Sequence, residues 1–415
     1  MNNNTVLIIG LVWPEPKSSA AGQRMLQLIL LFQKWGYKII FVSTALENGL
    51  NFDLNAINVE KVSIELNANS FDDFVKESNP TIVLFDRFVT EEQFGWRVTQ
   101  NCPSALKILD SEDLHCLRYT RASNFKKGVP FHVENLFEED WTKREIASIL
   151  RCDLTLIIAE FEMEVLAQYF KIESHLLFYL PLLFEDADLN FEHAPNDFLE
   201  RKDFVFIGNF WHEPNWDAVL YLKKIIWPLI RKQLPKASIL IYGAYPSQKV
   251  FNLHNKKEGF LVMGRADDAR SVISSARVLL APIRFGAGIK GKLLEAMQFG
   301  TPTVTTTVGA ESINGAFNWN GFIVDDPNEI ASKAILLYEN EELWQQSQRQ
   351  GRLILSERFR WSDFERPFKK RIVFVMENLL SHRKANFYGA MLLHHSMKSS
   401  EYLSRWIQEK NKEVF

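Results

Sequence analysis

Short apolar runs alternate with longer amphipathic stretches over the first 183 residues of the chain. The runs have the length and the branched side chains of buried strands, and the stretches between them carry apolar residues at helical spacing. Strands that alternate with helices favour a parallel sheet with right-handed crossovers. The expected strands are 6–10, 38–43, 62–66, 81–85, 105–110, 153–158 and 175–183, and helices are expected at 23–35 and 71–78.

A second strand–helix series follows an acidic stretch, 185–202, which has no sustained period and is the expected linker. This series opens like the first, with a strand, a glycine and a proline-containing loop. Its expected strands are 203–209, 238–243, 260–264, 278–281, 302–306 and 321–325, and its expected helices are 215–234, 267–276, 291–299 and 328–338. The sequence therefore predicts an α/β fold of two doubly wound, Rossmann-like domains, 1–190 and 203–375, which face each other across a cleft.

The remaining residues, 376–415, are expected to form a C-terminal helical extension. Phe387, Met391, Leu403, Trp406 and Ile407 fall where one helix face would gather them. Such a stripe packs on its own protein more often than on a membrane, so we expect the extension to pack back on the N-terminal domain. Contact with a membrane or a partner is the alternative.

Composition narrows the classes of function. The chain has 415 residues, 47% of them apolar and 24% charged, with a net charge of -3, which disfavours a nucleic-acid binder. Three cysteines without a C-x-x-C pair indicate neither a disulfide framework nor a zinc site, and a reducing cytoplasm suits them best. No apolar run approaches the ~20 residues that span a bilayer, although peripheral attachment at the inner face of a membrane remains open.

A glycine-rich turn lies between the expected strand 278–281 and the expected helix 291–299. Gly286, Gly288 and Gly291 permit a close approach of a ligand to main-chain N–H groups at a helix start. Lys290 and Lys292 add positive charge there. The turn therefore predicts a cradle for the phosphates of a nucleotide.

Glu295 follows about one turn into that helix, where a carboxylate can accept hydrogen bonds from both hydroxyls of a ribose. The alternative is structural. The glycine loop would then carry solvated lysines, and Lys292 and Glu295 would form an ordinary i,i+3 helix pair.

Polar residues also gather where two expected strands of the N-terminal domain end. The loop after the first strand closes with small residues, including Gly22, at a helix start where a phosphate or sugar can reach the backbone. A second group of polar residues follows the expected strand 105–110 and consists of Asp110, Glu112, Asp113, His115 and Arg118. A histidine just after a strand can contact a substrate hydroxyl. The alternative for this second group is a helix-capping cluster with Asp110 or Ser111 as the N-cap.

Three segments carry a resemblance to a known family. The segment 281–311, with Arg284-Phe-Gly-Ala-Gly-Ile-Lys-Gly-Lys292 and then Glu295, resembles the donor-binding segment of retaining glycosyltransferases of family 4, the glycosyl transferases group 1. Segment 206–215 resembles the first strand and loop of that family's C-terminal domain. Segment 109–118 resembles the site loop of its N-terminal domain. The resemblance covers nearly all of 5–380. It implies the GT-B fold, a nucleotide-diphosphate sugar donor, hexosyl transfer with retention, and neither a metal ion nor another cofactor.

The chain departs from the family pattern at two places. The family's two glutamates stand as Glu-x7-Glu, and although Glu295 matches the second, Ala287 occupies the place of the first. The Arg and Lys that commonly hold the diphosphate are replaced near Asn209 and Asn215. We therefore expect cations of the glycine loop to bind the phosphates, and the amides of 286–288 to contact the sugar.

The resulting hypothesis assigns three roles. The residues expected to act catalytically are His115, Lys290 and Lys292. Those expected to bind the donor are Gly22, Asn209, Arg284, Gly286, Ala287, Gly288, Ile289 and Glu295. Those expected to face the acceptor, a saccharide, lipid-linked or protein hydroxyl, are Asp110, Glu112, Asp113 and Arg118.

Two other functions fit the same pattern. A non-catalytic sugar-nucleotide-binding subunit of a transferase complex is consistent with the missing glutamate, and a nucleotide-sugar epimerase would use a similar two-domain fold. A dehydrogenase is disfavoured because no G-x-G-x-x-G follows the first strand at Gly10.

Overall fold

The N-terminal sheet is parallel and has seven strands in the order β3-β2-β1-β4-β5-β6-β7. The computed structural model describes residues 4–189 and 198–412, so residues 190–197 of the expected linker lie outside the described residues. The strands are β1 (Thr5–Gly10), β2 (Lys38–Ser43), β3 (Glu60–Ser63), β4 (Ile82–Asp86), β5 (Leu106–Asp110), β6 (Leu154–Ile157) and β7 (Leu177–Tyr179).

The C-terminal sheet is also parallel, with the order β10-β9-β8-β11-β12-β13. Its strands are β8 (Lys202–Ile207), β9 (Ile239–Tyr242), β10 (Phe260–Gly264), β11 (Ala276–Ala281), β12 (Thr303–Thr305) and β13 (Gly321–Ile323). In both sheets the strand order reverses beside the first strand, and ligands of such sheets bind outside the carboxyl ends at that point. The expected α/β fold of two Rossmann-like domains is confirmed, and every expected strand is found within a few residues of its place.

The helices of the N-terminal domain are α1 (Ala20–Lys34), α2 (Asn69–Ser78), α3 (Arg87–Asn101), α4 (His115–Lys127), α5 (Asp140–Arg151) and α6 (Glu160–Glu164). Helices α3, α4 and α5 were not among those expected from the sequence. Ion pairs on buried faces explain this for α3, since Glu91 pairs with Arg151 at 2.5 Å and Arg97 with Asp72 at 2.6 Å. Charged residues on a packed face obscure the apolar period that reveals a helix.

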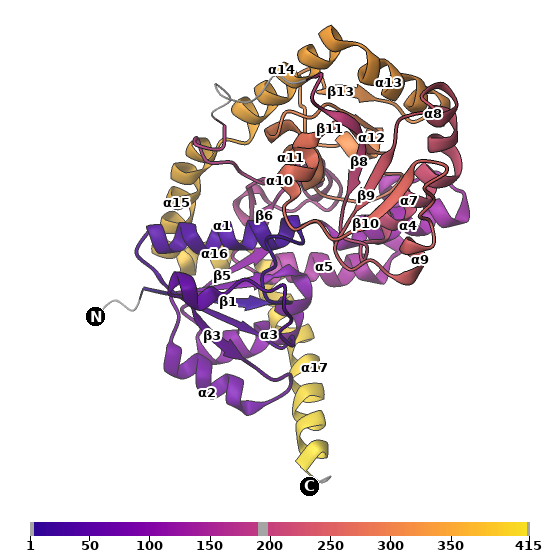
Figure 1. Ribbon diagram of the computed structural model, residues 1–415. Helices are drawn as coiled ribbons and strands as arrows, with labels where there is room; N and C mark the ends of the chain where they lie inside the picture. The colour runs from indigo at the N-terminus through magenta and orange to yellow at the C-terminus, as the bar shows by residue number, and fades with distance from the viewer. Residues whose placement is uncertain (1–3, 190–197, 413–415) are drawn as a thin grey trace.

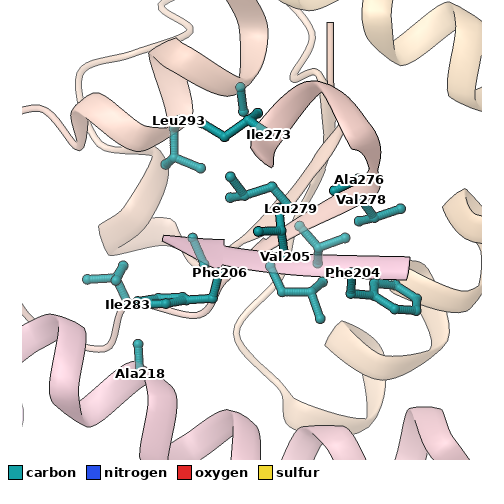
Figure 2. Close-up of a cluster of buried hydrophobic side chains, with 14 of the residues drawn as sticks. Phe204, Val205, Phe206, Ala218, Ile273, Ala276, Val278, Leu279, Ile283 and Leu293 are labelled. Carbon is teal, nitrogen blue, oxygen red and sulfur yellow. The ribbon is translucent and has the colours of Figure 1, made fainter. Parts of the chain in front are cut away.

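The helices of the C-terminal domain are α7 (Glu213–Tyr221), α8 (Trp227–Gln233), α9 (Gln248–Phe251), α10 (Ala269–Ser275), α11 (Gly291–Gln298), α12 (Thr307–Ala310), α13 (Pro327–Glu339) and α14 (Glu341–Arg358). A π-helical turn, Leu222–Ile226, joins α7 to α8. Figure 2 shows the core under β8 and β11, with Leu293 of α11 beside Ile273 of α10. This packing holds the start of α11, and with it the glycine loop, against the sheet.

The chain returns to the N-terminal domain after α14, through α15 (Trp361–Glu377), α16 (Leu379–Ala385) and α17 (Phe387–Lys412) (Figure 1). Phe368 and Ile372 of α15 are buried in the same cluster as Val6 and Ile8 of β1. By packing, α15 belongs to the N-terminal domain, whereas the sequence interpretation counted 361–375 with the C-terminal one. An amphipathic stripe shows that a helix packs but not on which domain.

Helix α17 packs on α3 and α5 of the N-terminal domain. Ser404 accepts a hydrogen bond from Arg97 at 3.0 Å, and buried Gly389 lies against the carbonyl of Leu150. The apolar stripe expected to make this contact instead faces outward, because the side chains of Phe387 and Trp406 are 68% and 59% exposed. Small and polar residues form the packing face of this helix.

Candidate functional site

The glycine loop joins β11 to α11 at the carboxyl edge of the C-terminal sheet. Gly286 and Gly288 have φ angles of 155° and 63°, which side chains rarely allow. A Cβ at Gly288 would lie 2.9 Å from Cβ of Asp113 and 3.1 Å from Ile158 of the N-terminal domain. A glycine at 288 therefore lets the loop touch the opposite domain at the segment that carries His115.

Two lysine ammonium groups lie at the start of α11 and are partly buried. Lys290 Nζ donates to the carbonyl of Gly288 at 2.8 Å, and Lys292 Nζ donates to Oδ1 of Asn215 at 2.6 Å. Within 4–189 and 198–412, neither lysine forms an ion pair with a carboxylate. Burial lowers the pKa of Lys290 to about 8 and that of Lys292 to about 7. Nearby carboxylates, chiefly Glu311 for Lys290 and Glu295 for Lys292, only partly offset this effect of burial.

Glu295 lies one turn further along α11, in a narrow crevice between the domains. Burial raises its pKa to about 7, and nearby Lys292 opposes that rise. The crevice is lined by Gln23, Gln27, Leu182, Leu183, Phe184, Gly291, Leu294 and Glu295. The Glu295 side chain thus lies opposite Gln23 and Gln27 of α1 in the N-terminal domain.

Asn209, in the loop after β8, is connected to Lys292 through Asn215. Its carbonyl accepts from Nδ2 of Asn215 at 2.7 Å, and Asn215 in turn holds Lys292. A Cβ at Gly208 would lie 2.7 Å from Nζ of Lys292, so glycine leaves the space that the ammonium group occupies. The expected site residues Asn209 and Lys292 are therefore brought together.

Arg284 is not in this group. Its guanidinium donates to both carboxylate oxygens of Asp217, at 2.9 and 2.6 Å, and lies over the rings of Tyr221 and Phe125. A cation that is paired and covered in this way offers no free charge to a phosphate. The positive charge at the loop therefore comes from Lys290 and Lys292.

The other expected donor residues lie along the seam between the domains. Ala287 packs against an apolar cluster of the N-terminal domain, and Ile289 is buried. Gly22 is buried in the first turn of α1, where its amide donates to Oγ of Ser19 at 3.0 Å. The start of α1 faces the start of α11, since a Cβ at Gly291 would lie 2.7 Å from Cβ of Ala20.

His115 begins α4 at the carboxyl edge of the N-terminal sheet. The residue is buried, its Nε2 lies 3.5 Å from Oδ1 of Asp113, and its ring packs edge-on against Phe88 and Tyr119. Burial lowers the pKa of His115 to about 3, although Asp113 opposes this, so the imidazole is neutral at physiological pH. The alternative of a helix-capping cluster with Asp110 or Ser111 as the N-cap is wrong, because the N-cap is Leu114.

Two of the expected acceptor-side carboxylates are paired with arginines. Asp110 is fully buried and accepts from Nε and Nη2 of Arg24 at 2.9 and 2.8 Å. Asp113 pairs with Arg118 at 2.6 Å, and although burial opposes it, Arg118 holds the pKa of Asp113 below its usual value. Asp110 thus fixes α1 to β5, while Asp113 and Arg118 remain partly accessible.

Glu112 belongs to a buried cluster at the ends of β4 and β5 that the sequence interpretation only partly identified. Glu112 and Arg87 both have left-handed backbone angles, with φ of 62° and 68°. Burial raises the pKa of Glu112 to about 8, with Asp110 adding to the effect. Oε1 of Glu112 and Oδ1 of Asp86 are buried, and neither has a hydrogen-bond partner among the residues that the structure describes. These acceptor atoms lack donors that a ligand hydroxyl would supply.

Glu162 on α6 links the two halves of the site, and sequence reasoning missed it. Its Oε1 accepts from the amides of Leu114 and Gly288, each at 2.9 Å, so one oxygen bridges the domains. Oε2 is buried and has no hydrogen-bond partner in the described part of the chain, and burial raises the pKa of Glu162 to about 8. The amide of Gly288, expected to face the sugar, is therefore occupied by a carboxylate. No sequence signal identifies this contact, because 126 positions separate the two residues.

Arg121 on α4 makes the second bridge to the glycine loop. It donates to the carbonyl of Gly286 at 2.9 Å and to both carboxylate oxygens of Glu311, at 2.8 and 2.7 Å. Its partner Glu311 follows β12, so the contact joins three segments of the cleft wall. The loop is thus held from the N-terminal domain at both Gly286 and Gly288.

No group of three or more His, Cys, Asp or Glu residues within 4–189 and 198–412 has an arrangement that could hold a metal ion. None of the described helices combines the length and the apolar character needed to cross a membrane.

The C-terminal domain is similar to known proteins. Residues 201–340 match the family described as glycosyl transferases group 1. An uncharacterized 44.6 kDa protein in the cps region of Klebsiella pneumoniae is 22% identical over 268 residues, 61% of this chain. That match spans 65% of the relative's length, just under two thirds.

Solved structures match nearly the whole chain. A glycosyltransferase from Rickettsia africae ESF-5 has a TM-score of 0.65 at 12% identity, over 92% of this chain and 99% of that one. Anabaena Alr3699/HepE in complex with UDP-glucose has a TM-score of 0.62 at 11% identity, over 89% and 99%. The expected GT-B fold is therefore confirmed, and its C-terminal domain contains the segment that matches glycosyl transferases group 1.

Proposed function

We propose that this protein transfers a sugar from a nucleoside-diphosphate sugar to an acceptor hydroxyl with retention of the anomeric configuration. The observation that carries the proposal is the pair Lys290 and Lys292. Both ammonium groups lie at the start of a helix in a glycosyl transferases group 1 domain, without a carboxylate partner among the described residues. A diphosphate supplies the charge that they lack, and the N-terminus of α11 adds its dipole.

In the proposed reaction the diphosphate is the leaving group. Negative charge grows on it as its bond to the anomeric carbon breaks, and the two ammonium groups stabilise that charge. The acceptor oxygen forms its bond on the same face, and its proton passes to the departing phosphate oxygen. Lysine charge does this without a resident metal ion or other cofactor. Glu295 holds the ribose hydroxyls in the interdomain crevice.

On the sugar side, neutral His115 offers Nε2 to a hydroxyl of the transferred hexose. Glu162 takes the position of a sugar-binding carboxylate that Ala287 leaves vacant. Its Oε2 has no partner, and its Oε1 already contacts the amide of Gly288. When the donor enters, a sugar hydroxyl supplies the missing hydrogen bond to Glu162.

The acceptor approaches from the N-terminal domain, past Asp113, Arg118 and the unpartnered oxygen of Glu112. We propose a saccharide, free or linked to lipid or protein, as the acceptor, because vicinal hydroxyls match carboxylate and guanidinium groups.

The three buried free thiols suit a cytoplasmic enzyme. Its donor is a nucleotide sugar, and attachment to the inner face of the membrane is a further part of the proposal.

A thermal-shift screen with nucleoside diphosphates and their sugars tests binding, since a ligand of the native state raises the melting temperature. Turnover of the best donor is then compared in Lys290→Ala, Lys292→Ala and the control Lys232→Ala, an exposed lysine on α8. We expect a loss of about a hundredfold or more in the first two variants only. Near-normal turnover in both would refute the proposal.

The same experiment separates the two rival functions. A non-catalytic subunit would bind the nucleotide sugar and release no nucleoside diphosphate with any acceptor. An epimerase would convert the donor sugar in the absence of an acceptor.

A further inference from the structure

Trp211 is a large aromatic residue exposed at the mouth of the cleft. It lies in the loop between β8 and α7, and its side chain is 71% exposed. One face of the indole stacks on the ring of Tyr245, with centroids 3.7 Å apart and planes inclined by 14°. Most of the remaining surface is open to water, so the opposite face of the indole is available for stacking.

The stack is held from both domains. The hydroxyl of Tyr245 donates to the carboxylate of Glu15, which lies 2.7 Å away at both of its oxygens and belongs to the loop after β1. Tyr245 itself has a left-handed backbone angle, with φ of 55°. The ring on which Trp211 rests is therefore fixed in orientation, and the Trp211 surface spans the two domains where the cleft opens.

Polar groups surround this aromatic surface on its N-terminal side. Asn48 Nδ2 donates to Oε1 of Glu15 at 2.8 Å and lies 3.3 Å from the hydroxyl of Tyr245. Asn51 Nδ2 also donates to Oε1 of Glu15, at 3.3 Å. A flat apolar face bordered by a carboxylate and amides is complementary to a pyranose ring, which has an apolar C–H face and hydroxyl groups around its edge.

A chain of hydrogen bonds connects this surface to the phosphate-binding lysine. The amide of Trp211 donates to Oδ1 of Asn209 at 2.9 Å. The carbonyl of Asn209 accepts from Asn215, which holds Lys292. A ligand that rests on Trp211 is thus adjacent to the candidate donor site and continuous with it.

We propose that Trp211 and Tyr245 form a saccharide subsite at the mouth of the cleft, where a sugar ring of the acceptor stacks on the open face of Trp211, beside the polar groups of Glu15 and Asn48. This inference rests on the proposed transferase function and names the acceptor's chemistry. A nucleobase is the less suitable occupant. The expected ribose ligand Glu295 opens into the crevice beside α1 rather than onto the loops after β1 and β2.

A glycan array that carries short oligosaccharides, probed with the full chain in the presence of UDP, tests the subsite. The variants are Trp211→Ala, Trp211→Phe and the control Trp406→Ala, whose indole on α17 is 59% exposed. Loss of a stacked ring is expected to weaken glycan binding by roughly tenfold, and phenylalanine is expected to recover part of it. The control variant should bind the array like the wild type. Melting temperatures check that each variant is folded.

The affinity for UDP is measured by calorimetry for the same proteins. Glycan binding that falls in Trp211→Ala while the affinity for UDP changes less than threefold would support the subsite. Equal glycan binding in Trp211→Ala, no glycan bound by the wild type, or a tenfold loss of UDP affinity in Trp211→Ala would overturn it, the last pointing to a nucleobase site. Failure of the wild type to bind any nucleoside diphosphate would instead refute the proposed function.

Discussion

Lys292→Met tests whether the unpaired lysines are the diphosphate site. In the free protein, burial lowers the pKa of Lys292 to about 7 and that of Lys290 to about 8. A bound diphosphate brings negative charge to both, so their pKa values rise above 8 in the complex. Nucleoside diphosphate binding at mildly alkaline pH should therefore take up protons, and methionine at 292 should reduce that uptake at nearly constant side-chain volume.

The expected uptake follows from the pKa values. At pH 8, a lysine of pKa about 8 is about half protonated and one of pKa about 7 about one-tenth protonated, so both together gain about 1.4 protons on binding. Glu295, with a pKa of about 7, must ionise to accept ribose hydroxyls and releases about 0.1 proton at that pH. The net uptake is about 1.3 protons, of which Lys292 supplies about 0.9.

The sign of the pH dependence follows. Because the lysine pKa values are depressed in the free protein and rise on binding, affinity should fall as the pH rises from 7 to 9. Near pH 7 the uptake by the lysines and the release by Glu295 nearly cancel. Isothermal titration calorimetry with UDP, at pH 7 and pH 8 in buffers of different ionisation enthalpy, measures both quantities.

Lys232→Met, at an exposed site on α8, is the matched control and should keep the full uptake. Binding of UDP without net proton uptake at pH 8 would refute the reasoning. Equal uptake by Lys292→Met and the wild type would place the diphosphate elsewhere.

Three further substitutions test separate parts of the account. Gly208→Ala places a Cβ 2.7 Å from Nζ of Lys292, so UDP should bind at least tenfold more weakly by calorimetry, with the melting temperature little changed. Arg24→Met leaves fully buried Asp110 without its cation and should cost about 3–5 kcal/mol in urea unfolding; a loss under 1 kcal/mol would contradict the assignment. Glu162→Gln removes an ionisable side chain whose pKa burial raises to about 8. In the wild type, the raised pKa stabilises the fold below pH 4.5, and this stabilisation is lost as the pH rises to 8. This variant should therefore melt above the wild type at pH 8 but not at pH 5, and no difference between the two pH values would contradict the burial argument.

The sheets could be predicted because most strands are short apolar runs with buried side chains. Thr5–Gly10 and Ala276–Ala281, for example, are such segments, and their neighbours in the sheet follow from the βα alternation. The glycine loop could also be predicted, since glycines between a strand and a helix start give a physical reason for a ligand site. The lysines at 290 and 292 lie at that helix start in the structure.

Contacts between distant segments could not be predicted. Glu162 meets Gly288, and Asp217 binds Arg284, across separations of 126 and 67 residues. Neither pair leaves a periodic or motif signal, so the sequence interpretation left the Gly288 amide and the Arg284 charge free for a ligand. Trp211 was missed for a related reason. Its exposure and its stack on Tyr245 arise only when the loops after β8 and β9 come together.

The central claim is retaining transfer from a donor held by Lys290 and Lys292, and the anomeric configuration of the product tests it most directly. The full chain is incubated with the nucleotide sugar that the thermal-shift screen selects and with a saccharide acceptor, and the new glycosidic bond is examined by proton NMR, because a glycosidic bond does not change anomer in solution. We expect the product of the wild type to keep the anomeric configuration of the donor, and we expect almost no product with Lys290→Ala or Lys292→Ala. The opposite anomeric configuration, or unchanged yields in both variants, would contradict the claim.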